Sequence, residues 1–218
     1  EGNMKKWTAE GGIGIIASRL TIQGPLKKDK CSIMLSGRRT YIDLFTKEIL
    51  KKVQDGKFAG NSYYFYDINA KINYRFSDKD RVYISGYFGR DVFKFKDPDG
   101  QFSLDFPWGN STVTARWNHV FDEKLFMNTS LVYNDYRFAA NIKFLDVKFD
   151  VKSSIQQISA KIDYDYSPII GHLMKFGIHY NHHIFTPYTA TGSDGTNSFK
   201  NSNANKKYAH ETAVYFLD

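Results

Sequence analysis

A strict two-residue alternation of apolar and polar side chains constrains the fold of this chain most. Between residues 63 and 77, the even positions hold Tyr64, Tyr66, Ile68, Ala70, Ile72, Tyr74 and Phe76, and the odd positions from 67 onward hold Asp67, Asn69, Lys71, Asn73 and Arg75. A β-strand sends alternate side chains to opposite faces of its sheet, whereas a helix would scatter both sets around its axis. The segment is therefore predicted to be a strand with one apolar and one polar face.

The same alternation returns along the whole chain. Between residues 157 and 166, for example, Ile158, Ala160 and Ile162 alternate with Ser159 and Lys161. Nine such runs are predicted, at 14–24, 31–45, 63–77, 81–95, 108–122, 125–138, 154–166, 173–186 and 208–218. The best helical window, Ile42 to Val53, is short, so the sequence predicts an all-β fold.

The links between the runs are of two kinds. Short polar links are predicted at 24–30, 77–80, 121–124 and 167–172, and longer ones at 46–62, 96–107, 139–153 and 186–207. The last of these is a low-complexity polar loop rich in Gly, Ser and Asn. Short and long links therefore alternate along the chain.

This rhythm favours a membrane barrel over a soluble sandwich. Sandwich strands are short, with turn signals every 8–12 residues or so, whereas runs of about 10–15 residues can cross a bilayer at a tilt of ~45°. Transmembrane barrels combine short periplasmic turns, long extracellular loops, an apolar outer face and two aromatic girdles. Tyr64 and Tyr66 lie near one end of the clearest run, and Tyr74 and Phe76 near the other. The predicted fold is an antiparallel transmembrane β-barrel.

Composition excludes several other classes. The chain of 218 residues is 17% aromatic, which argues against disorder, and its single cysteine excludes a disulfide scaffold or a cysteine-built metal site. A spanning helix is excluded because the longest stretch without Asp, Glu, Lys or Arg, Phe176 to Ser193, contains three histidines and a proline. No secretory signal opens the chain. A polar barrel lumen accounts for the low mean hydropathy of −0.47.

The number of runs predicts a partial barrel. Single-chain bacterial barrels close with an even number of strands, and nine runs are predicted here. The last run, which contains Tyr215 and Phe216, is interrupted by the end of the sequence. An open sheet edge in lipid would expose unpaired backbone groups that cost several kcal/mol each. We therefore expect the 218 residues to be part of a larger barrel.

The first 45 residues carry specific motifs. These are Glu1-Gly2-Asn3-Met4-Lys5-Lys6-Trp7, Gly11-Gly12-Ile13-Gly14, Ser18 to Leu26 (SRLTIQGPL), and Ser36-Gly37-Arg38-Arg39-Thr40-Tyr41-Ile42-Asp43-Leu44. Together they resemble the first barrel strands of TonB-dependent outer-membrane receptors of Bacteroidetes type. The run Ser-Gly-Arg-Arg-Thr-Tyr is the most distinctive of them. Beyond residue 45, the resemblance depends on the hairpin rhythm, which any large outer-membrane barrel shares.

The resemblance implies a 22-stranded barrel closed by a plug domain, with residues 1–12 as the connection from the plug and 13–218 as barrel strands. It implies active uptake of a scarce nutrient across the outer membrane of a Gram-negative bacterium. Siderophore, cobalamin, glycan and peptide remain equal alternatives for the cargo. The implied partners are the TonB–ExbB–ExbD complex, the protein's own plug, lipopolysaccharide and other outer-membrane lipids, and a surface lipoprotein. Neither nucleic acid nor a cofactor is expected. The plug and the TonB box are expected upstream.

Seven charged residues fall in phase with the polar face and are candidates for the lumen: Arg38, Asp67, Lys71, Arg75, Lys161, Asp163 and Asp165. They are expected either to contact the plug and the translocation path or to form a solvated lumen lining. Arg39 falls in phase with Ile33 and Leu35, a position that costs about 2–4 kcal/mol at mid-membrane. It is expected either to reach the headgroups or to be turned inward by a bulge.

Metal binding and catalysis receive little support from the sequence. On a strand, His179 and His183 share a face but lie ~13 Å apart, and His182 points the other way. The pair cannot hold a tetrahedral zinc ion, whose ligands lie ~2.0–2.3 Å from the metal, so no metal site is predicted. No hydrolase or phosphate-binding motif occurs, so an enzyme is not expected.

A soluble β-rich module is the alternative. Such a module would stack bases or sugars on its aromatic side chains, and its basic residues should cluster on one face. Here, basic residues occur in runs and links alike, with acids such as Asp78, Asp80, Asp122 and Glu123 among them.

Overall fold

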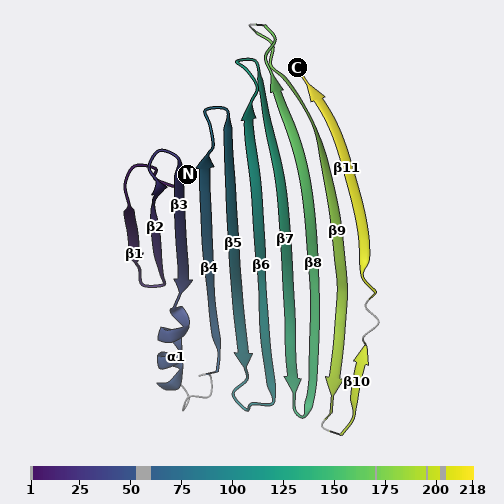
Figure 1. Ribbon diagram of the computed structural model, residues 1–218. Coiled ribbons are helices and arrows are strands. Elements are labelled where there is room, and N and C mark those ends of the chain that lie inside the picture. The colour runs from purple at the N-terminus through teal and green to yellow at the C-terminus, as the bar shows by residue number, and fades with distance from the viewer. Residues whose placement is uncertain (1, 53–59, 170, 195, 202–204) are drawn as a thin grey trace.

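The computed structural model describes residues 2–52, 60–169, 171–194, 196–201 and 205–218, and shows one twisted, open sheet (Figure 1). The strands are β1 (Thr8–Ile13), β2 (Ala17–Lys27), β3 (Cys31–Thr40), β4 (Ser62–Arg75), β5 (Asp80–Lys96), β6 (Phe102–Val120), β7 (Leu125–Phe144), β8 (Val147–Tyr166), β9 (Met174–Ser193), β10 (Ser198–Asn201) and β11 (Lys207–Leu217). A single helix, α1 (Ile42–Lys52), is present among these residues. The expected all-β fold is confirmed.

Every strand is antiparallel to its neighbour in the chain from β1 to β9. Strands β10 and β11 both pair with β9, so they follow one another along the same side of it. Strands β7 and β8 pair along all 20 residues of each. Hairpin after hairpin therefore builds a single curved wall with β1 at one edge and β11 at the other (Figure 1).

Strand β1 lies before the first predicted run, and helix α1 lies between β3 and β4. Residues 8–13, which overlap the expected connection at 1–12, pair with β2 from Thr8 opposite Gln23 to Ile13 opposite Ser18. The strand run predicted at 31–45 was wrong at its end, because β3 stops at Thr40 and α1 begins at Ile42. The helix lies in the window that was the best helical candidate, whose last residue, Val53, lies outside the described residues with the rest of 53–59. No helix in the described ranges has the length and apolarity needed to cross a membrane.

The prediction of long links after β5 and β7 was wrong. The link expected at 96–107 is only 97–101, and the one expected at 139–153 is only 145–146, because the flanking strands continue through most of both segments. Most of the segment expected as a loop at 186–207 likewise belongs to β9 and β10, although 195 and 202–204 lie outside the described residues. Strands β5 to β9 are therefore 17–20 residues long.

The register assigns every strand residue to one of two faces. We call the face of Ile68 and Ile84 the outer face, and the face of Asn69 and Ser85 the inner face, because outer-membrane barrels turn apolar residues to lipid and polar residues to the lumen. Many large apolar side chains on the outer face are at least a third exposed, among them Leu20, Leu35, Ile68, Ile84, Phe88, Val113, Trp117, Leu131, Ile158, Ile178, Val214 and Phe216. Inner-face side chains form cross-strand hydrogen bonds, such as Thr112 to Asn134 (2.7 Å).

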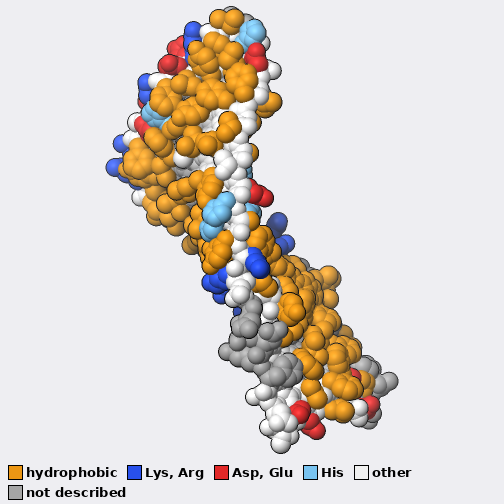
Figure 2. Space-filling view, turned by 90° about the vertical axis from the view of Figure 1, so that its right-hand side faces the viewer, with side chains coloured by type: hydrophobic (Ala, Val, Ile, Leu, Met, Phe, Trp, Pro, Cys, Tyr) orange, Lys and Arg blue, Asp and Glu red, His pale blue; other side chains and the backbone are white. Residues whose placement is uncertain are grey.

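The sheet has almost no core of its own. Among the described residues, only Cys31, Val92 and Met127 are buried apolar side chains. Figure 2 views the molecule from the edge formed by β11, and shows hydrophobic side chains exposed over much of that side. Water would penalise such an apolar surface, since large exposed apolar patches mark interaction or membrane surfaces. The outer face therefore has the surface chemistry expected where lipid takes the place of a second layer.

The same substitution at two neighbouring residues on opposite faces tests this assignment. Ile84→Arg should destabilise the protein by about 2–4 kcal/mol in a bilayer, because a cation would face hydrocarbon near the middle of the wall. Ser85→Arg should have little effect, because this side chain faces the inner side. Denaturant unfolding in phospholipid vesicles measures both. Equal losses for the two variants would contradict the assignment of faces.

Candidate functional site

All seven charged residues predicted for the lumen lie on the inner face. Arg38 is opposite Asp67 between β3 and β4, Lys71 is opposite Ser85, and Arg75 is opposite Arg81. On β8, Asp165 is opposite Lys175 of β9, and Lys161 and Asp163 share its phase. The structure divides the seven into two groups, on β3–β4 and on β8, with three strands between them.

Arg38 and Asp67 form the best-defined ion pair of the inner face. The Nε and Nη2 atoms of Arg38 each lie 2.7 Å from Oδ2 of Asp67, and the guanidinium lies 4.9 Å from the ring centre of Phe65. The Asp67 side chain is only 10% exposed, whereas that of Arg38 is 51% exposed. The pair therefore presents a partly free guanidinium above a covered carboxylate, an arrangement that can still bind an anionic or polar group.

The group on β8 is charge-balanced. Nζ of Lys161 lies 3.1 Å from Oδ1 of Asp163, and Nζ of Lys175 lies 3.4 Å from Oδ1 of Asp165. The Tyr215 hydroxyl donates a hydrogen bond to Asp163 from β11. Each acid therefore has a cation beside it, so this group can line a wet lumen without concentrating charge of one sign.

Arg39 lies on the outer face, as its phase indicated. No register shift interrupts the pairing of β3 with β4 between Cys31 and Arg39, so no bulge turns the side chain inward. Its guanidinium lies 5.4 Å from the ring centre of Tyr64, and its Nη2 is 3.6 Å from Oδ2 of Asp43 at the start of α1. Arg39 therefore lies among the aromatic and polar groups expected at the membrane interface.

Beyond the membrane-facing segment, the inner face changes from polar to aromatic. The two-residue alternation did not predict this change. Toward the end of the sheet near α1, the inner face carries the aromatic cluster Tyr63, Phe65, Phe93, Phe106, Trp108 and Phe138 on β4 to β7. The rings of Tyr63 and Trp108 are stacked at 6.3 Å, and Phe106 lies 5.3 Å from Trp108 and 6.2 Å from Phe138. The signal was present in β4, whose odd positions are aromatic at 63 and 65 and polar only from 67 onward.

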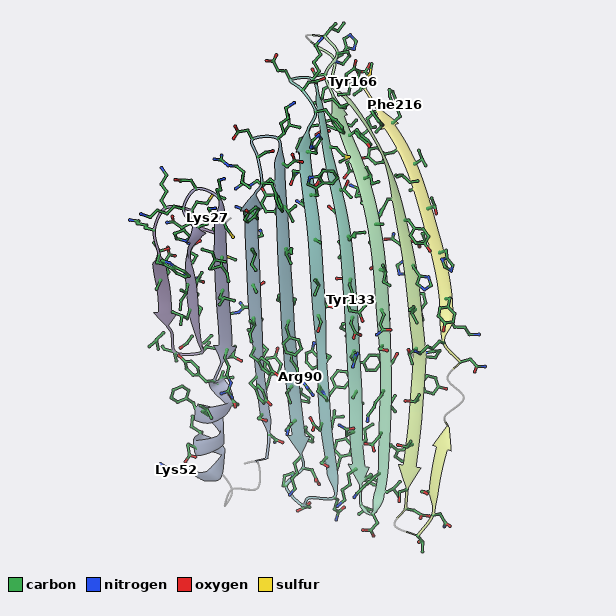
Figure 3. All side chains as sticks on the ribbon, viewed as in Figure 1. Lys27, Lys52, Arg90, Tyr133, Tyr166 and Phe216 are labelled. Carbon is green, nitrogen blue, oxygen red and sulfur yellow. The ribbon has the colours of Figure 1, made fainter. Side chains whose placement is uncertain are left out.

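At the same level along the strands, the outer face changes from apolar to polar. Apolar residues give way to Arg90 after Phe88 on β5, and to Asp135 after Tyr133 on β7. Figure 3 shows Tyr166 and Phe216 near the end of the sheet farther from α1, Tyr133 near mid-height and Arg90 nearer the end with α1. The strands are thus apolar outside and polar inside over one part, and polar outside and aromatic inside over the rest.

A small hollow adjoins the aromatic cluster on the inner face. It has a volume of about 240 Å³, and its inner-face lining is Arg38, Tyr63, Phe65, Asp67, Tyr87, Gly89 and Asp91. The Tyr63 hydroxyl donates to Oδ1 of Asp91 at 2.9 Å. A side chain at Gly89 would take space from the Tyr87 hydroxyl, so glycine keeps the hollow open. Aromatic faces, one guanidinium and two carboxylates there can contact part of an organic ligand with polar groups, since the volume is below the roughly 300–1,000 Å³ of a site that encloses one.

The histidines divide between the two faces. On the outer face, His182 is opposite His210 of β11, with ring centres 4.5 Å apart. On the inner face, Nε2 of His183 lies 3.2 Å from Oε2 of Glu211. Within the described ranges, no three or more His, Cys, Asp or Glu side chains are grouped to hold a metal ion.

One comparison with solved structures agrees with this architecture. No protein-family model matches the sequence. A search of curated proteins gives no match either. Among solved structures, the ferric yersiniabactin uptake receptor FyuA from Yersinia pestis is similar over 96% of this chain, with a TM-score of 0.57 and 12% identity. The outer membrane protease OmpT from Escherichia coli aligns over 97% of this chain and 84% of its own, with 9% identity and a TM-score of only 0.37.

The likeness to FyuA shows the fold. The chain spans 37% of the length of that receptor, and the matched part is an antiparallel sheet. The chain has the fold of an outer-membrane β-barrel wall, and this fold indicates the outer membrane as its location.

The ion pair of Arg38 with Asp67 gives a stability prediction. Arg38→Ala leaves a mostly covered carboxylate without its cation, and we expect a loss of about 1 kcal/mol, since the exposed guanidinium is well screened. Exchanging the two, with Arg38→Asp and Asp67→Arg together, should recover most of it. Arg75→Ala is the control, because Arg75 has no ion pair in the described part of the chain. Denaturant midpoints that fall equally for both alanine variants would contradict the role of the pair.

Proposed function

We propose that this chain forms part of the barrel wall of a TonB-dependent outer-membrane transporter of Bacteroidetes type. The observation that carries the proposal is the reversal of outer-face polarity along β5 to β9, together with an inner face that is polar within the membrane and aromatic beyond it on β4 to β7. An aromatic wall can capture an organic cargo by stacking, and a hydrated lumen can pass it on. The motifs in residues 1–45 and the likeness of fold support this class.

The partners follow from the same proposal. A plug domain would contact the inner face of residues 13–218, with residues 1–12 leading from it, and the TonB–ExbB–ExbD complex would supply energy. Lipopolysaccharide and other outer-membrane lipids would contact the outer face, and a surface lipoprotein would assist capture. Arg38 is the inner-face residue best placed for a contact with plug or cargo, because its guanidinium is half exposed. The balanced group on β8 suits a solvated lining better.

We propose uptake of a scarce nutrient, with siderophore, cobalamin, glycan and peptide as the alternatives, and no catalysis. The experiment uses the full-length protein in its own outer membrane. Uptake of each labelled cargo should fall to background when a protonophore removes the energy source, and when the gene is deleted. Energy-independent uptake of the cargo would contradict the proposal.

A soluble β-rich binding module remains the second hypothesis, because aromatic and basic residues also serve carbohydrate and nucleic-acid recognition. The exposed apolar residues of the outer face, such as Leu131 and Val214, oppose it. Fractionation separates the two: the barrel should partition into detergent, whereas a module would stay monomeric in buffer.

Two tryptophans on opposite faces test the aromatic cluster. Trp108→Ala should raise the half-saturating cargo concentration about tenfold, equivalent to 1.4 kcal/mol, by removing a stacking surface. Trp117→Ala is the matched control, because Trp117 lies on the outer face, where its indole N–H donates to Asp80. Initial uptake rates over a range of cargo concentrations measure both. A similar increase in the two variants would speak against capture by the cluster.

A further inference from the structure

A second hollow, of about 540 Å³, lies on the outer face over β5 to β9. Its centre is one row of the register, in which Arg90, Gly109, Arg137, Ser154 and Thr186 lie side by side on consecutive strands. Gly109 has no side chain, so the two arginines flank an open space. Their backbones are two strand spacings apart, roughly 10 Å, which long arginine side chains can bridge.

The hollow is cationic. Three exposed cations line it, Arg90, Arg137 and Lys152, against one acid, Asp135. Asp135 is only 10% exposed and is held by Arg137, whose Nη2 and Nε lie 2.5 and 2.9 Å from its Oδ2. Within the described ranges, Arg90 and Lys152 have no ion-pair partner. Two positive charges are therefore left over for a ligand.

The level of the hollow indicates what kind of ligand reaches it. It begins where the apolar part of the outer face ends, at Phe88 on β5, and Tyr133 on β7 lies on the side of it that is farther from α1 (Figure 3). Groups at this level meet lipid headgroups, as tyrosine girdles do in outer-membrane barrels. Farther from the membrane, the outer face stays rich in lysine, with Lys96 and Lys143 flanking Ser103 in one row.

We propose that this hollow binds a phosphate group of lipid A, the glycolipid anchor of lipopolysaccharide, in the outer leaflet beside the barrel. Guanidinium groups match phosphate oxygens in planar, paired hydrogen bonds, and Lys152 adds a point charge. The volume is within the range of small-molecule sites, so the phosphate and part of its sugar fit. The inference rests on the outer-membrane location in the proposed function and on the end of the wall near α1 facing outward, but not on transport.

The experiment measures lipid A binding to the full-length protein, purified from outer membranes into neutral detergent. Arg90→Gln combined with Lys152→Gln should weaken binding at least tenfold. Lys96→Gln combined with Lys143→Gln removes the same charge from the outer face away from the hollow, and should stay within twofold of wild type. Arg137 is left unchanged, because its loss would leave Asp135 covered and unpaired. Ser154→Trp keeps every charge but fills the hollow, and should also weaken binding.

Three outcomes would overturn the proposal. These are equal losses in the two glutamine pairs, equal affinity of wild type for lipid A and for dephosphorylated lipid A, or inorganic phosphate binding as tightly as lipid A. Electrophoresis without heating confirms that each variant is folded. Cargo uptake is measured in the same variants and should be retained. A wild type that binds lipid A in this pattern without energy-dependent uptake would refute transport alone.

Discussion

The backbone hydrogen-bond ladder is the interaction on which the rest of this structure depends. The sheet has one layer and almost no buried apolar core in its described residues, so packing within the protein cannot hold it together. In lipid, each unpaired backbone group costs several kcal/mol, which makes continuous pairing obligatory. The unbroken register of β7 with β8 meets that demand, and because side chains alternate with period two, it also fixes both faces at once.

The reversal of polarity lets one strand serve two surroundings. On β5, Gly89 and Asp91 line the inner hollow while Arg90, between them, lines the outer one. Of these three consecutive residues, two therefore face the inner side, where cargo would pass, and one faces the lipid headgroups. Both hollows are lined in part by Gly89 and Arg90, which are adjacent on the strand and therefore lie on its opposite faces.

Many of the strands, and the face on which each residue lies, could be predicted from the sequence, because two-residue alternation is a local signal. The strands around Tyr64 and Ile158, the faces of Arg38 and Arg39, and the separation of His182 from His183 all follow from phase alone. Residues 139–153 were mistaken for a loop because, once polarity reverses, polar residues such as Lys152 mark the outer face of a strand. The pairing of Arg38 with Asp67, 29 residues away, depends on register, which alternation leaves open. The outer hollow depends on five strands at once, so no local pattern could reveal it.

The positions of the charges also set the level of the wall in the membrane. A cation at the middle of a lipid-facing strand costs about 2–4 kcal/mol, but only about 0–1 near the interface. On the outer face of β3, the first arginine is Arg39, two residues beyond Gly37. On β5, Arg90 follows Phe88 in the same way, and the register aligns Arg39 and Arg90 on either side of Tyr66. A shift of this part of the wall by two residues into the bilayer would bring both guanidiniums toward hydrocarbon, and the opposite shift would expose Phe88 to water. The level is therefore fixed by the energy of misplacing a few side chains, and the sheet needs no separate anchor.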